Sequence, residues 1–287
     1  MKKYCFILIV LILSAFSGCS TKYIGSGLND LHKSSDIIAE SLAGVITEII
    51  DNDMELRAER SITKLTINSS DLEPVIISFK NLRIRRELAD CLVEYSGLLE
   101  ALFKKEHSKY VKGYGEDLGE SLDKIYSFDQ ELISKNVRGI LSTIITMAPE
   151  GVTFLKKRKF ALKLMGEMQE VIDNVSGKLK EEVSSLKLLA PNLYTRLFRE
   201  KVENKWPDKE EKRLKYALTG VKIIRKKERF EDLTNDLLKT LNIFPREHKK
   251  LMESLRKNGG LLLGLSELLN YSIRLKKNFD LFSKGEY

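Results

Sequence analysis

Apolar residues recur every three or four positions along most of the chain, which is the spacing of amphipathic helices. A first such stretch runs from Leu28 to about residue 66, and a second runs from a Ser70 to Glu73 capping box to about His107. In the first stretch the apolar stripe consists of Leu31, Ile38, Leu42, Val45, Ile49, Met54, Ala58, Ile62 and Leu65. No stretch shows the two-residue alternation of a β-strand. The sequence therefore predicts an all-α fold.

Glycines and prolines mark the expected ends of the later helices. We expect a break at residues 112–115 before a third helix, and a fourth helix from about Thr153 to Leu189. Pro191 is expected to separate the fourth helix from a shorter one, and Pro245 to open another helix. A near-heptad seam on the fourth helix comprises Leu164, Met168, Val171, Val175, Leu179, Val183 and Leu186.

A further helix is expected over residues 209–241, and a last one from Leu261 to Phe282. The helix over 209–241 is very basic in its middle, yet it keeps one apolar stripe made of Leu214, Leu218, Val221, Ile224 and Leu237. At 1.5 Å per residue the fourth helix alone is ~50 Å long, and short connections favour antiparallel neighbours. We therefore expect an elongated antiparallel bundle of long amphipathic helices over residues 28–287, with a candidate sub-boundary near 190–208.

Residues 1–18 have the anatomy of a secretory signal peptide. Met1 to Lys3 form a short positive region, the run from Cys5 to Leu13 is apolar, and small residues follow it. A bilayer-spanning helix needs about 20 apolar residues, so this run is too short to cross a membrane. The leader predicts export of the chain.

The segment Phe16-Ser17-Gly18-Cys19 resembles the lipobox of bacterial lipoproteins. This resemblance implies cleavage between Gly18 and Cys19, a diacylglycerol and an N-acyl chain on Cys19, and a lipidated tether over residues 19–27. Ser20, rather than Asp, follows the cysteine. By the same resemblance, the outer membrane facing the periplasm is a better expectation than the inner membrane. An ordinary secretory leader with a chance cysteine is the alternative.

The chain is basic, with 49 Lys and Arg against 41 Asp and Glu and a net charge of +8. An exported basic protein meets anionic lipids or acidic proteins rather than nucleic acid. The four cations Lys156, Lys157, Arg158 and Lys159 directly follow the apolar segment 139–148 and a Pro149 break. These cations and the apolar segment are candidates for contact with an anionic membrane surface. Alternatively, the apolar segment is a helix end buried in the core, and the four cations are the solvent-exposed start of the next helix.

Candidate catalytic and metal-binding chemistry is sparse. His32, His107 and His248 each lack a second ligand at helical spacing. Residues 51–55 imitate the start of a calcium loop, but Leu56 stands where that loop needs glycine. Cys91 is interpreted as a small core residue. We expect no metal, no cofactor beyond the acyl chains, and no enzymatic activity.

These observations favour a membrane-anchored periplasmic lipoprotein that acts as a helical interaction or scaffold module, with another envelope protein as its partner. A lipid-binding, apolar-ligand-binding or membrane-docking protein is the first alternative. An exclusion or immunity lipoprotein of a mobile element is the second, and no residue supports it specifically.

Replacing Cys19 with alanine removes the sulfur that would carry the diacylglycerol. We expect mass spectrometry of the full chain from a Gram-negative host to find acylated Cys19 in the wild type and an uncleaved, unmodified chain in Cys19→Ala. A wild-type chain that is cleaved but carries no acyl group would support the ordinary secretory leader instead.

Overall fold

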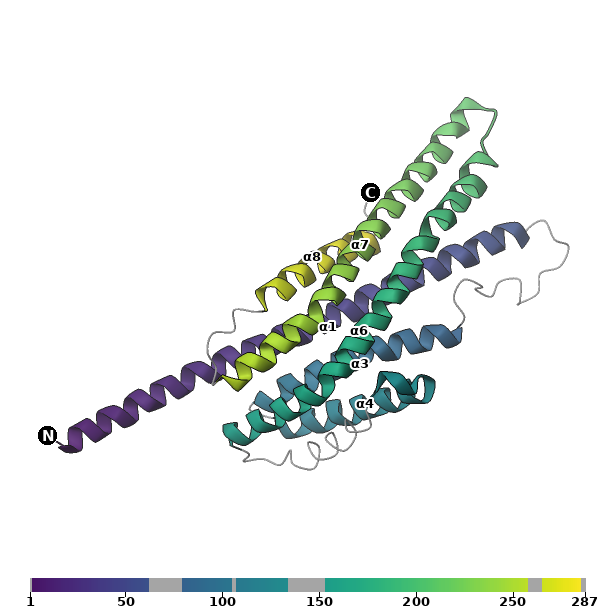
Figure 1. Ribbon diagram of the computed structural model, residues 1–287. Coiled ribbons are helices and arrows are strands. Elements are labelled where there is room, and N and C mark those ends of the chain that lie inside the picture. Colours follow the sequence, from purple (N-terminus) through teal and green to yellow (C-terminus); the bar gives the residue numbers. More distant parts are fainter. Residues whose placement is uncertain (1, 62–78, 105–106, 134–152, 258–264, 285–287) are drawn as a thin grey trace. The chain divides into compact units, whose positions relative to one another are not determined.

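The computed structural model describes residues 2–61, 79–104, 107–133, 153–257 and 265–284 (Figure 1), with only the backbone described for 2–24, 79–82 and 107–108. The α-helices are α1 (Lys2–Ser61), α3 (Phe79–Phe103), α4 (His107–Phe128), α6 (Phe154–Phe198), α7 (Glu210–Arg256) and α8 (Ser266–Ser283). Two short turns follow α4 and α6: the 3-10 turn η1 (Gln130–Leu132) and the π-helical turn η2 (Arg199–Glu203). The described residues include no strand, and the predicted all-α helical bundle is confirmed.

The chain forms two compact units. The first unit comprises residues 1–36, 90–176 and 243–270, and the second comprises residues 37–89, 177–242 and 271–287. Helices α1, α3, α6, α7 and α8 contribute residues to both. The segment 190–208, expected as a candidate sub-boundary, lies wholly in the second unit.

Helix α6 buries the predicted seam completely. All seven seam residues, from Leu164 to Leu186, are at most 1% exposed. The seam residues follow one another at steps of three or four, which return to the same face of a helix, so these side chains form one apolar edge. Each fully buried side chain of this kind contributes roughly 1.5–3 kcal/mol to stability.

The stripe on α1 is confirmed in its first half and wrong at Met54 and Ala58, which are exposed, while Ile62 and Leu65 lie outside the described residues. The five residues from Leu31 to Ile49 are at most 2% exposed, whereas Met54 is 38% exposed. The buried face instead continues through Asn52 and Leu56, at steps of three and four residues from Ile49. Asn52 is polar, but its side-chain Nδ2 donates a hydrogen bond to Glu48 Oε1 over 2.6 Å, which makes its burial tolerable.

The expected break at residues 112–115 is wrong, because α4 runs through both glycines. Each glycine inside a helix costs about 1 kcal/mol relative to alanine. Packing of Tyr114 offsets this cost: its ring lies edge-on against His32, with centroids 5.5 Å apart. It also fills the space beside Gly97, where a Cβ atom would come within 2.5 Å of the Tyr114 ring.

Pro191 and Pro245 do not begin new helices, since α6 continues through the first and α7 through the second. A proline inside a helix costs about 3 kcal/mol. After Pro191 the buried face nevertheless continues with Leu193, Tyr194 and Leu197, which are all at most 3% exposed. At roughly 1.5–3 kcal/mol each, these buried side chains outweigh the lost hydrogen bond.

Side-chain contacts give the helix directions in the second unit. Helices α1 and α6 are parallel, because successive contacts advance along both helices in the same direction. The contacts are Glu48 with Tyr194, Glu55 with Lys201 and Glu59 with Lys205, each 146 residues apart in the sequence. Helices α6 and α7 are antiparallel, with Lys180 bonded to Asn242 and Lys187 to Asn235. Helix α8 is antiparallel to α7 through Arg274 to Asp236 and Arg229 to the Leu281 carbonyl.

A buried carboxylate, Glu48, joins three helices of the second unit. Its side chain is 7% exposed and accepts hydrogen bonds from Asn52 on α1 (2.6 Å) and the Tyr194 hydroxyl on α6 (3.1 Å). On α7, the Lys226 ammonium lies 2.7 Å from Glu48 Oε2. Both carboxylate oxygens therefore have donors, as a buried charge requires.

Replacing Glu48 with alanine removes the buried carboxylate that accepts from the Tyr194 hydroxyl and the Asn52 amide and pairs with Lys226. We expect a loss of about 2–4 kcal/mol in the free energy of unfolding, measured by urea titration followed by far-UV circular dichroism. The matched control is Glu59→Ala, which removes the more exposed pair with Lys205 and is expected to cost less than about 1 kcal/mol. Equal losses in the two variants would contradict this account.

A buried, neutral histidine on α7 contacts two other helices of the first unit. His248 on α7 is fully buried, its Nε2 lies 2.5 Å from the Tyr95 hydroxyl on α3, and its Nδ1 lies 2.7 Å from Gln169 Oε1 on α6. Because the Gln169 amide nitrogen donates to the Pro245 carbonyl, its oxygen faces His248 and accepts the Nδ1 proton. Burial lowers the pKa of His248 from 6.5 to about 3.

This lowered pKa makes the stability depend on pH. The unfolded chain binds a proton at His248 near pH 6.5 and the folded chain does not, so the stabilisation is complete above pH 6.5 and is lost as the pH falls towards 3. We expect His248 to remove about 2 kcal/mol from the free energy of unfolding between pH 7 and pH 5. In His248→Gln, which keeps a donor and an acceptor, this part of the pH dependence should disappear; an unchanged slope in urea titrations would contradict the assignment.

Candidate interaction surface

The first half of α7 exposes a row of large apolar side chains in the second unit. Leu214 is 68% exposed, Leu218 53%, Val221 42% and Ile224 49%. Helical periodicity predicts that these residues share one stripe with Leu237, but Leu237 is fully buried while the first four face solvent. We call these four residues the α7 stripe. Contiguous exposed apolar area of this kind is typical of an interaction surface.

Cations accompany the α7 stripe. From Lys212 to Lys227 the chain carries seven Lys and Arg residues and no Asp or Glu. A helix advances about 100° per residue, which places Lys215 and Lys222 together on one flank of the stripe and Arg225 at its C-terminal continuation. Lys215 and Arg225 form no ion pair with any residue that the structure describes. They are therefore available to an anionic partner.

A groove lies beside the opposite flank of the stripe. It has a volume of about 250 Å³ and runs between the end of α6 and α7. Tyr194 and Phe198 line it from α6, and Ile223 and Ile224 line it from α7. The polar residues Thr195, Arg199, Glu203 and Lys227 complete its lining. Ile224 belongs to both the groove and the α7 stripe, so the two adjoin.

The α6–α7 hairpin holds this surface in place. The two helices approach closely at Gly220, where a Cβ atom would come within 2.9 Å of the Phe198 ring. At the start of α7, the Arg213 guanidinium donates to the carbonyls of Pro207 (3.3 Å) and Asp208 (2.9 Å). Further along, Lys226 is tied to Glu48 on α1. These contacts fix which face of α7 is turned outwards.

A second groove of about 600 Å³ lies between α1, α7 and α8 in the second unit. Its charged lining is mostly paired internally: Lys226 with Glu48 (2.7 Å) and Lys276 with Glu40 (2.8 Å). The hydrogen bond with Glu40 raises the pKa of Lys276, so this ammonium stays charged. The groove thus has no uncompensated lysine to offer to an anionic ligand.

The four cations of the predicted basic site at 156–159 have different environments in the structure. Lys156 and Lys159 are exposed at the start of α6 and stay candidates for contact with an anionic surface. Burial lowers the pKa of Lys157, which is only partly exposed. Arg158 instead caps the end of α7 by donating to the carbonyls of Leu255 (2.7 Å) and Arg256 (2.8 Å). The apolar segment 139–148 lies outside the described residues.

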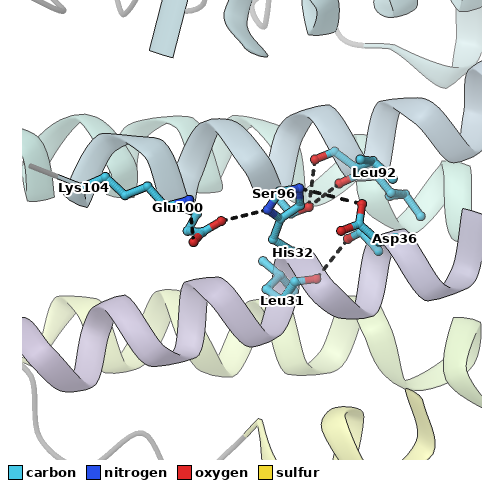
Figure 2. Close-up of polar contacts among 9 residues, drawn as sticks. Leu31, His32, Asp36, Leu92, Ser96, Glu100 and Lys104 are labelled. Atoms are coloured by element: carbon cyan, nitrogen blue, oxygen red, sulfur yellow. Dashed lines mark hydrogen bonds and ion pairs between the residues drawn. The ribbon is translucent and has the colours of Figure 1, made fainter. Parts of the chain in front are cut away.

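His32 belongs to a half-buried polar cluster in the first unit (Figure 2). Its Nδ1 lies 2.8 Å from Glu100 Oε2, and Lys104 lies 2.9 Å from the other oxygen of this carboxylate. Burial raises the pKa of Glu100, but the hydrogen bonds with His32 and Lys104 outweigh it and hold the pKa below its usual value. The neighbouring Ser96 hydroxyl donates to the Leu92 carbonyl of its own helix over 2.7 Å. The cluster therefore links α1 to α3 through the His32–Glu100 contact. Among its described residues, it does not have the hydrogen bond from serine to histidine that a catalytic pair needs.

Cys91 is a buried core residue, as the sequence analysis interpreted it. Cys91 is 1% exposed and burial raises the pKa of its thiol, which disfavours the nucleophilic thiolate. Within the described parts of the chain, no three His, Cys, Asp or Glu side chains form a group that could hold a metal ion. No helix in those parts is both long enough and apolar enough to cross a membrane. Lipidation at Cys19 and cleavage after Gly18 stay predictions.

Comparison with protein-family models, curated proteins and solved structures found no match to this chain. The candidate surface therefore rests on the chain's own residues. The sequence pattern placed the α7 stripe on one face together with Leu237 but did not say whether that face is buried, because periodicity shows that residues share a face without showing where that face points. The run of seven cations without an acid was the available signal that it faces outwards.

Proposed function

We propose that this protein is a membrane-anchored periplasmic lipoprotein that acts as a non-enzymatic helical interaction module in the cell envelope. Cys19 carries the anchor, and an amphipathic helix of another envelope protein is the partner. The observation that carries the interaction part is the α7 stripe together with its adjoining groove. A ridge of side chains on a helix fits such a stripe and groove, as in other helix-in-groove complexes.

The lipobox resemblance at residues 16–19 supports the anchored location. Anchoring would restrict the surface to partners within reach of the same membrane, which raises their effective concentration. The membrane-docking alternative through residues 139–159 has less support, because Arg158 is engaged with the end of α7.

The test is a pull-down from cross-linked cells with the full chain tagged at Tyr287. We expect a partner that is recovered with the wild type to fall at least tenfold with Leu218→Glu, since a buried carboxylate in the interface is unfavourable. The matched control, Ile273→Glu, places the same charge at a 57% exposed position on α8 and should recover the partner normally.

Equal recovery with the two variants would contradict the interaction surface on α7. Loss of the partner in Cys19→Ala as well would support the anchor, whereas full recovery without acylation would separate the surface from the proposed location.

A further inference from the structure

We infer that the partner of the α7 surface is an amphipathic helix that carries acidic residues along one flank, an inference that rests on the proposed function. The surface combines an apolar stripe, a groove on one side and cations on the other. Each of these three features restricts what can bind.

The cations select an acidic partner. Lys215 and Lys222 lie one above the other on one flank, seven residues apart, and Arg225 follows Val221 by four residues. Lys215 and Arg225 have no ion pair within the described structure. A helix docked along the stripe would bring one of its own flanks against Lys215 and Lys222 and the end of that flank close to Arg225, so acidic residues there would be attracted and basic residues repelled.

The groove favours a protein helix over a bilayer. A membrane surface is flat on this scale and leaves a 250 Å³ hollow beside Ile224 unfilled, whereas one large side chain of a docked helix can fill it. The charge pattern agrees. A helix lying in a membrane interface carries cations beside its apolar face, but here Glu228 is exposed four residues after Ile224, where anionic lipid would repel it.

The stripe itself sets the length of the contact. From Leu214 to Ile224 it extends about 15 Å along the helix axis, which is close to three helical turns. A partner therefore needs apolar residues at three- and four-residue spacing over about three turns. One larger apolar side chain at the Ile224 end would enter the groove between Tyr194 and Phe198.

The experiment uses three labelled peptides of equal length and fluorescence anisotropy with the full chain. The acidic peptide has an apolar ridge over three turns and Glu along one flank. The basic peptide has the same ridge with Lys in place of each Glu, and the shuffled peptide has the acidic composition without a ridge. We expect the acidic peptide to bind at least tenfold more tightly than the basic one and the shuffled peptide to bind least, with the preference shrinking as salt is added.

Variants of the chain test the assignment to residues. In Lys215→Glu with Arg225→Glu, the preference should reverse towards the basic peptide. The matched control Lys163→Glu with Lys249→Glu makes the same change in charge at two exposed positions of the first unit, on α6 and on the second half of α7, and should keep the acidic preference. In Leu218→Glu, both ridge peptides should lose binding.

The outcomes separate the inference from the proposed function. Equal binding of both ridge peptides, lost in Leu218→Glu, would overturn the acidic partner while leaving the interaction module in place. Ridge peptides that bind no better than the shuffled one would overturn both. Flotation with vesicles of anionic phospholipid that is lost in Leu218→Glu and retained in Ile273→Glu would overturn the helix partner in favour of a membrane surface.

Discussion

The fold depends on the apolar face that α6 buries along its length. The seam from Leu164 to Leu186 is almost inaccessible to water, and Leu193 and Leu197 continue it beyond Pro191. Hydrophobic burial of this extent tolerates one missing backbone hydrogen bond, which is why the proline does not end the helix. In the second unit, α1 packs parallel to this helix and α7 packs antiparallel to it, so α6 sets the register of both.

Buried polar groups then restrict which arrangement the apolar faces adopt. Hydrophobic contacts alone are non-directional, whereas Glu48 needs donors from α1, α6 and α7 at defined positions. His248 has the same effect in the first unit, where it requires a donor on α3 and an acceptor on α6. Sliding α6 by one turn would separate Glu48 and His248 from their partners on that helix, and a buried polar group that loses its hydrogen bond is unfavourable.

The same physics explains why part of α7 stays at the surface. Its first half carries seven cations without an acid, and a closely packed position for that segment would bury charges without partners. Lys226 is compensated by Glu48, but Lys215 and Arg225 have no described partner. The α7 stripe is held next to these charges and therefore remains exposed with them. An apolar surface bordered by uncompensated cations is suited to an acidic amphipathic partner.

The sequence by itself determined the helical class, the seam of α6 and the first half of the stripe on α1, because three- and four-residue periodicity depends only on local order along one helix. It also contained the lipobox resemblance at Cys19 and the cation run of α7. Only the tertiary structure decided that Gly113, Gly115, Pro191 and Pro245 lie inside helices, since contacts such as Tyr114 against Gly97 outweigh local propensity. It also decided that Arg158 caps α7 and that the α7 stripe faces outwards, because the direction of a face depends on the helices packed around it.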